Sequence, residues 1–305
     1  MMQGLRLRVD PSRDGVRLDR FLRLELPELP GRSVTFAIAS GDVSVGGGRA
    51  AKGRVVRRGE EVLVRRIPEE ADWLPRPADL PGASVLYEDA SVTVLDKPAG
   101  AHSEPHRPAE AGTLAGYLLY RHPGVAAFSR APGLSLLARL DFAVSGAVPA
   151  ALSARALEFL VREREAGRIR KVYACVVTGH LAEETTVSFV LDTRGGEKVR
   201  VRTDRREPDP RYWTVVSPVR SAGPLTLVRA TIAKGKRHQV RAHLAAAGFP
   251  IVGDGLYAAR PSEGSGSGRL MLHAAEVSFL HPERREGITV VSPLPAVFDV
   301  TDRTN

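Results

Sequence analysis

One carboxylate stands apart in the stretch LLARLDFAVSG, residues 136–146, where Asp141 directly follows Arg139 and Leu140 and has small and apolar neighbours. A carboxylate in apolar surroundings tends to take up a proton, and a nearby arginine reverses that tendency. Hydrolysis of a glycosidic bond uses two carboxylates, one as acid and one as base or nucleophile. A lone acid such as Asp141 instead suits a reaction that needs only one.

Three further stretches combine reactive or basic side chains. They are DKPAG at 96–100, RKVYACVVTG at 170–179 and KGKRHQVRAHLAAAGFPIVGDGLYA at 234–258. In the last, basic residues precede an apolar helix that closes with Pro250 and a Gly-Asp-Gly turn. Taken singly, each stretch has a structural explanation, because a tyrosine on a strand is usually core and a basic helix start is usually solvated.

The sequence lacks the motifs of several common catalytic and ligand-binding sites. VGGGRAAKGR does not have the residue order of a phosphate-binding loop, and neither H-E-x-x-H nor G-x-S-x-G occurs. The eight histidines form no compact ligand cluster, and the single Cys175 excludes an internal disulfide and a multi-cysteine zinc site. We therefore expect no bound metal.

The charge balance indicates a polyanionic partner. The formal net charge is +9, and residues 1–66 hold 14 Lys and Arg against 8 Asp and Glu, a difference of +6. Nucleic acid and anionic membrane are the usual partners of such a surface. The sequence contains no run of about 18 apolar residues, the length needed to span a bilayer. The start of the chain has no signal-peptide core, so we expect a cytoplasmic protein without a membrane partner.

The elements that must hold these residues fall into three parts. In residues 1–66, apolar spacing predicts a helix at 17–26, Ser33 can cap a second helix that ends at Gly41, and two strands follow in DVSVGGG and EEVLVRRI. Prolines predict an extended linker at 67–83.

Residues 84–305 are predicted to form one α+β domain. SVLYED and SVTVLDK are strands around a turn at Asp89, and β-branched runs such as KVYACVVTGH and LTLVRATIA add more. Helices are expected at 151–165 and 237–247, without the spacing of βαβ units. PSEGSGSG, residues 261–268, reads as a flexible surface loop.

In their order and spacing, these motifs resemble those of the RluA-type pseudouridine synthases. LYEDASVTVLDKPAG, RLDFAVSG, RKVYACVVTG, KGKRHQVRAHLAAAGFPIVGDGLY and LMLHAAEVSFLHP carry the resemblance, over about residues 84–295. RLDRFL, the GRS turn and GDVSVGG in residues 1–66 resemble the S-four RNA-binding domain found in many of these enzymes. The resemblance implies a mixed, largely antiparallel catalytic sheet behind a small helical and hairpin RNA-binding domain.

The resemblance also implies a reaction and its residues. Uridine within RNA is cut at its glycosidic bond, and the base is turned and rejoined through carbon, with no cofactor. Asp141 matches the catalytic aspartate, which acts either as nucleophile or as base on a sugar proton. Tyr173 matches the residue that stacks on the base and assists deprotonation at carbon 5, and Arg241 matches the partner of the aspartate.

Other residues are expected to contact RNA. The target nucleotide must leave its stack to be reached, and Arg139 is placed to fill the space that it vacates. The residues expected to bind the substrate are Arg139, His238, Gln239 and Leu272. The residues expected to bind the RNA backbone are Arg17, Arg20, Arg32, Arg54, Lys236 and Arg237.

The sequence departs from the family pattern at a few positions. Ala138 replaces a usual histidine and Val144 a usual threonine, both in the loop of Asp141, and Lys236 and Arg237 replace a usual Arg-Thr pair. Large-subunit ribosomal RNA is the expected partner, and no protein partner is implied. Transfer RNA as substrate and a catalytically weak RNA-binding or RNA-folding factor are the alternatives.

Overall fold

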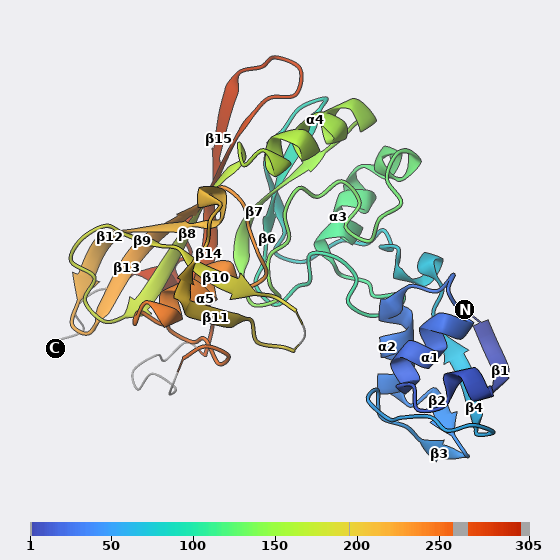
Figure 1. Ribbon diagram of the computed structural model, residues 1–305. Helices are drawn as coiled ribbons and strands as arrows, with labels where there is room; N and C mark the ends of the chain where they lie inside the picture. Colours follow the sequence, from blue (N-terminus) through green and yellow to red (C-terminus); the bar gives the residue numbers. More distant parts are fainter. Residues whose placement is uncertain (1, 195, 259–267, 300–305) are drawn as a thin grey trace. The chain divides into compact units, whose positions relative to one another are not determined.

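The computed structural model describes residues 2–194, 196–258 and 268–299 (Figure 1). The chain divides into two compact units, Met1–Arg76 with Pro105–Ala111, and Pro77–Glu104 with Gly112–Asn305. In the part that the structure describes, no helix is long and apolar enough to cross a membrane. The loop predicted at 261–268 lies outside the described residues, except for Gly268.

The first unit is a four-stranded sheet covered by two helices. The strand order is β1-β4-β2-β3. The bounds are β1 Met2–Arg8, η1 Pro11–Arg13, α1 Leu18–Glu25, α2 Gly31–Ser40, β2 Val43–Val45, β3 Gly48–Arg49 and β4 Glu61–Ile67. Leu18, Phe21 and Leu22 are fully buried because their helical spacing places them on one face of α1. The predicted helices, hairpin and following strand are confirmed, whereas β1 was not predicted.

Two details of the first unit differ from the prediction. Ser33 does not cap α2, which begins at Gly31; its buried hydroxyl accepts a hydrogen bond from Trp73 Nε1 at 2.9 Å. Trp73 ends the short helix η2, Glu70–Trp73, inside the segment predicted to be extended. Its ring packs edge-on against Phe36 on α2. Packing of the indole therefore stabilises a short helix in a segment whose prolines predict an extended chain.

The second unit is built on a nine-stranded sheet. The order is β5-β6-β7-β14-β8-β13-β12-β9, and β15 pairs with β14. Neighbouring strands are antiparallel except β7 and β14, which confirms the predicted α+β class with a mixed, largely antiparallel sheet. The strands are β5 Ser84–Glu88, β6 Val92–Lys97, β7 Ser145–Ala151, β8 Arg170–Thr178, β9 Thr185–Val187, β12 Thr214–Ala222, β13 Leu225–Ile232, β14 Leu272–Leu280 and β15 Gly287–Val291.

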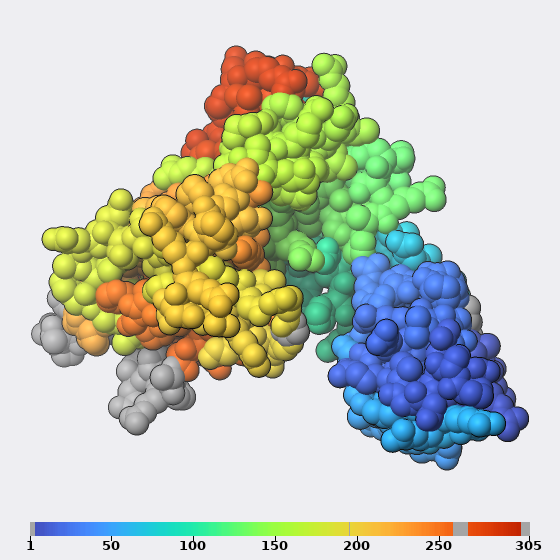
Figure 2. All heavy atoms as spheres, viewed as in Figure 1, coloured from blue at the N-terminus to red at the C-terminus, as the bar shows by residue number. Residues whose placement is uncertain are grey.

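Helices and a hairpin complete this unit. A separate hairpin pairs β10 Phe189–Asp192 with β11 Arg200–Arg206; it appears in yellow on the surface of the unit in Figure 2. The helices are α3 Leu114–Arg121, η3 Pro123–Ala127, α4 Ala154–Glu165, η4 Pro210–Tyr212, α5 Gln239–Ala246 and η5 Ala296–Phe298.

The parallel pairing of β7 with β14 requires a glycine. Gly146 has φ +119°, and a Cβ there would lie 2.3 Å from the carbonyl oxygen of Ala274. Only glycine tolerates both that conformation and that approach. The pairing fixes the start of β7, and therefore the loop that carries Asp141, against the centre of the sheet.

Asp89 ties the first hairpin of the second unit to the turn before β15. Its carboxylate accepts hydrogen bonds from the Tyr87 hydroxyl at 2.6 Å and from His281 Nε2 at 2.8 Å. It also accepts bonds from the backbone N–H groups of Ser91 and Val92. Burial alone would raise the pKa of Asp89, but these hydrogen bonds outweigh it and hold the pKa well below its ordinary value.

We expect Asp89→Asn to lower the free energy of unfolding by about 2 kcal/mol at pH 7, because the amide cannot accept all of these bonds. A carboxyl whose pKa is lowered by folding stabilises the fold above its unfolded pKa, about 3.9, and this contribution is lost as the pH falls. Urea unfolding between pH 7 and pH 2 should therefore show the two proteins converging. An equal difference at every pH would contradict this role, and Asp299→Asn, at an exposed carboxylate, is the control.

Candidate active site

Asp141 lies on a loop that is fixed by backbone hydrogen bonds. Leu140 donates from its N–H to Ser103 Oγ at 2.9 Å, and the same hydroxyl donates to the Leu140 carbonyl at 3.0 Å. Val144 N–H donates to the Asp141 carbonyl at 3.0 Å and closes a turn. The Asp141 side chain keeps 30% of its surface exposed. The loop therefore holds one carboxylate in place while leaving it open to a ligand.

Arg241 joins Asp141 to a second, buried acid. The Arg241 Nη1 lies 2.6 Å from Asp141 Oδ2. Its Nε and Nη2 donate to the two carboxylate oxygens of Asp254 at 2.8 and 2.9 Å. The Asp254 side chain is completely buried, and one of its oxygens also accepts the backbone N–H groups of Leu256 and Tyr257. Asp254 therefore fixes the planar guanidinium from behind, so that its free edge faces Asp141.

Arg241 and Asp254 each shift the pKa of the other toward its charged form. Burial alone would lower the pKa of Arg241, but Asp254 and Asp141 outweigh it and raise the pKa. Burial alone would raise the pKa of Asp254, and the hydrogen bonds from Arg241 bring it below its ordinary value. Arg241 is consequently a permanent cation. Asp254 was not predicted as a site residue, although the Gly-Asp-Gly turn that contains it was noted in the sequence.

His238 lies against the same carboxylate oxygen of Asp141 as Arg241. It precedes α5 in the left-handed conformation, with φ 55°. Its Nε2 lies 3.7 Å from Asp141 Oδ2, and its Nδ1 lies 3.1 Å from the Tyr257 hydroxyl. Burial is the main cause that lowers the pKa of His238, so its ring is neutral at pH 7. Asp141 opposes this shift, whereas Arg241 and Arg237 strengthen it.

The Tyr257 hydroxyl lies beside one ring nitrogen of His238 and favours a proton on the other. The Tyr257 hydroxyl accepts a hydrogen bond from the Val199 N–H at 2.8 Å, because a backbone N–H can only donate. The hydroxyl proton is then available for His238 Nδ1. With Nδ1 as acceptor, the neutral ring carries its proton on Nε2, the nitrogen that faces Asp141. The tip of the β10–β11 hairpin thus orients a donor in the site.

Lys97, in the DKPAG motif, holds the segment that follows it and also contacts the loop of Asp141. Its side chain is buried, and the ammonium group donates to the carbonyls of Ala101 at 2.6 Å, Pro98 at 2.9 Å and Phe142 at 3.5 Å. Burial lowers the pKa of Lys97 to about 8, against the opposing effect of the Asp141 charge. The motif was recognised in the sequence, but the lysine was not predicted as a site residue.

Tyr173 and Leu272 lie on adjacent strands of the central sheet, β8 and β14, and both are largely buried. Burial raises the pKa of Tyr173, and the nearby charge of Asp141 raises it further. The phenol is therefore neutral and a weak base at neutral pH. Stacking on the base and help in deprotonation both stay predictions for Tyr173.

The other two residues that were predicted to bind the substrate, Gln239 and Arg139, have very different surroundings. Gln239 is buried, and its amide donates to the Tyr212 carbonyl at 2.8 Å and accepts from the Lys236 N–H at 2.9 Å. Its polar atoms hold the loop before α5, which speaks against a substrate contact. Arg139 is 70% exposed and forms an ion pair of 2.5 Å with Glu104, so it is accessible to RNA.

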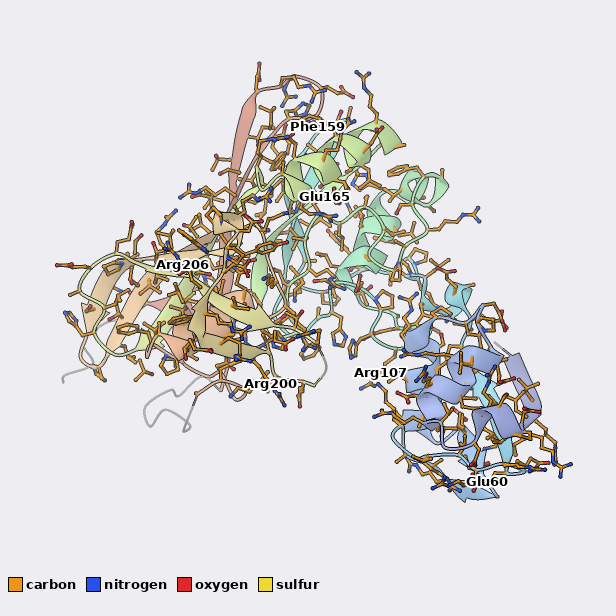
Figure 3. All side chains as sticks on the ribbon, in the orientation of Figure 1. Glu60, Arg107, Phe159, Glu165, Arg200 and Arg206 are labelled. Atoms are coloured by element: carbon orange, nitrogen blue, oxygen red, sulfur yellow. The ribbon has the colours of Figure 1, made fainter. Side chains whose placement is uncertain are left out.

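The basic residues before α5 are engaged within the unit. Lys236 Nζ lies 2.5 Å from Glu207 and 4.4 Å from the Tyr212 ring centre, so it is not a free phosphate ligand. Arg237 is exposed and donates to the Gly196 carbonyl at 3.0 Å. On the neighbouring hairpin, Arg200 and Arg206 mark the two ends of β11 (Figure 3).

In the first unit, the predicted RNA-binding arginines have different surroundings. Arg17 pairs with Asp19, and Arg54 pairs with Glu60, which is labelled in Figure 3. Arg32 lies 4.8 Å from the Trp73 ring. Arg20 is exposed.

Among the residues that the structure describes, no group of three or more His, Cys, Asp or Glu could hold a metal ion.

Comparison with known proteins identifies the class to which this fold and site belong. Residues 91–246 match the RNA pseudouridylate synthase family. The chain is 34% identical over 300 residues to ribosomal large subunit pseudouridine synthase D of Xanthomonas campestris pv. campestris, covering 94% of this chain and 88% of that protein. It is 33% identical to an uncharacterized RNA pseudouridine synthase of Chloroflexus aurantiacus, with 97% and 92% covered.

A solved structure agrees with the sequence relatives. Human RNA pseudouridylate synthase domain containing 1 superposes with a TM-score of 0.55 and 25% identity, covering 72% of this chain and 86% of that one. The chain therefore belongs to the RNA pseudouridylate synthase family, in its RluA type, as the sequence motifs predicted.

We expect Tyr257→Phe to free the imidazole of His238. The substitution keeps the ring and removes the hydroxyl, so His238 should become a mixture of its two neutral forms, and the free energy of unfolding should fall by about 1 kcal/mol. Nitrogen-15 NMR of the histidine rings reports the position of the proton. His273, whose Nδ1 faces Ser145, should not change. A wild-type His238 with its proton on Nδ1 would overturn the assignment.

Proposed function

We propose that this protein converts uridine to pseudouridine in large-subunit ribosomal RNA, with Asp141 as the reacting carboxylate. The names of several relatives, ribosomal large subunit pseudouridine synthases D and C, support this substrate. The observation that carries the proposal is the pairing of a partly exposed Asp141 with Arg241. A carboxylate that is held by a cation and stays partly exposed is suited to attack the anomeric carbon or to remove a sugar proton.

The second acid of the site supports an isomerase over a hydrolase. Asp254 is completely buried and both of its oxygens are used by Arg241. It has no access to a sugar or a water molecule, so the site offers one usable carboxylate instead of the two that glycoside hydrolysis needs. The detached uracil would stay bound, turn and rejoin the sugar through carbon, which requires no cofactor or second substrate.

The other residues receive roles that match their surroundings. In this proposal, Arg241 orients and neutralises Asp141, and Tyr173 lies against the uracil ring as a neutral phenol. His238 presents its Nε2 proton beside the carboxylate. Leu272 adds an apolar wall, and Arg139, which is exposed, fills the space left by the nucleotide that is turned out.

We further propose that residues 1–66 are an S-four-like RNA-binding domain, that 67–83 connect it, and that 84–305 form the catalytic domain. The excess of +6 in residues 1–66 supports a contact with phosphates. Arg20 is the strongest candidate among the predicted arginines, since it is exposed and, unlike Arg17 and Arg54, is not paired with a carboxylate of the described residues. Arg17 and Arg54 would have to exchange a carboxylate partner for a phosphate.

We expect Asp141→Asn to abolish pseudouridine formation, by at least about 10³-fold, while RNA affinity and stability stay close to those of the wild type. The amide has the same shape but cannot act as an anionic nucleophile or base. Single-turnover assays on unmodified large-subunit ribosomal RNA measure this, with Asp299→Asn as the matched control. Near-normal turnover in the Asp141 variant would refute the assignment.

Substitution of Arg20 by Gln in the full chain tests the RNA-binding role of the first unit. Each phosphate contact that is lost should reduce the slope of log K against log salt by about 0.7–0.9. Binding should weaken, whereas the single-turnover rate at saturating RNA should not change. Arg162→Gln, on the exposed face of α4, is the control, and an unchanged slope would show that Arg20 does not contact RNA.

A further inference from the structure

Phe142 directly follows Asp141 and exposes 51% of its surface. Most large aromatic side chains bury their rings, because each ring removes a large apolar area from water. The exposed ring of Phe142 lies on the same rigid loop as the candidate catalytic carboxylate. It is therefore an exposed aromatic surface one residue away from Asp141.

The backbone beneath Phe142 is held firmly. Its carbonyl accepts a hydrogen bond from the Gly100 N–H at 2.8 Å and a longer one from the buried Lys97 ammonium at 3.5 Å. On one side, the ring centre of His102 lies 4.7 Å away, at an interplanar angle of 50°. The Phe142 ring thus has a fixed base and a supporting neighbour, and does not need to be ordered when a ligand binds.

The surroundings of Phe142 distinguish an RNA base from an apolar protein partner. Arg139, two residues before Asp141, is 70% exposed and pairs with Glu104. A protein interface usually presents a contiguous apolar patch, whereas single-stranded RNA is gripped by aromatic rings beside basic groups. Phe142, with the exposed Arg139 three residues before it, resembles a site for single-stranded RNA more than a protein interface.

We propose that Phe142, supported by His102, is a stacking platform for an unpaired base of the substrate RNA, adjacent to the nucleotide that reacts at Asp141. This inference rests on the proposed function. The platform binds a nucleobase through its π-face and does not contact phosphate. Phe142 would thereby help to select target sites at which a neighbouring base is unpaired.

The platform predicts a specific order among variants of the full chain. Phe142→Tyr and Phe142→Trp keep a π-face and should retain the wild-type Kd for unmodified large-subunit ribosomal RNA within about threefold. Phe142→Ala and Phe142→Leu should raise the Kd by about 5- to 150-fold, the range measured for loss of one stacked base. Leucine separates stacking from apolar bulk, and all four should fold because the site is exposed.

The salt dependence of binding supplies an independent readout. Because no phosphate contact is lost, the slope of log K against log salt should be the same for Phe142→Ala and the wild type. Tyr120→Ala removes an aromatic ring that is 56% exposed on α3 and serves as the control. Equal Kd values for Phe142→Ala, Tyr120→Ala and the wild type would overturn the platform, as would a leucine variant that binds like the wild type.

The outcome is separable from that of the proposed function. If the wild type forms pseudouridine but the Phe142 variants bind RNA normally, the platform is wrong and the function stands. If the wild type forms no pseudouridine but the Phe142 variants lose affinity in the stated order, the platform stands and the function is wrong.

Discussion

The contact between Arg241 and its two acids is the interaction on which the site depends. A buried guanidinium is costly unless it is paired, and Asp254 meets that need with two hydrogen bonds from a completely buried position. The remaining edge of the guanidinium is then directed to Asp141 at 2.6 Å. One acid makes the arginine rigid, and the arginine holds the other acid, so that of the two acids only Asp141 stays accessible.

The fold serves this contact by joining distant segments. Gly146 allows β7 and β14 to pair in parallel, which places the Asp141 loop over the central sheet. Lys97 donates to the carbonyls of Pro98 and Ala101 and, at 3.5 Å, to the Phe142 carbonyl in the same loop, so it joins that loop to the segment after β6. The β10–β11 hairpin reaches the site through Tyr257, whose hydroxyl binds the Val199 N–H and lies 3.1 Å from Nδ1 of His238. Each segment supplies a hydrogen bond that sets an orientation, and the sheet supplies the burial that strengthens these bonds.

Local signals allowed much of the fold to be predicted from the sequence. Helical apolar spacing located α1, the left-handed Gly41 ended α2, and β-branched runs located the central strands. Trp73 and Ser33 could not be predicted, because their hydrogen bond joins residues 40 positions apart. Motif order indicated Asp141, Tyr173 and Arg241. Gln239 lies in the same motif but is used internally, and the motif gave no sign of the burial that makes Asp254 and Lys97 important.

The central claim is that Arg241 acts on Asp141 and not on the RNA backbone, and single-turnover rates at saturating RNA test it most directly. In Arg241→Met the rate should stay low at saturation, because the carboxylate loses the cation that holds and orients it. Arg241→Lys should lose less, since it keeps the charge but not the planar two-pronged contact. Full recovery of the Arg241→Met rate at saturating RNA would contradict the account.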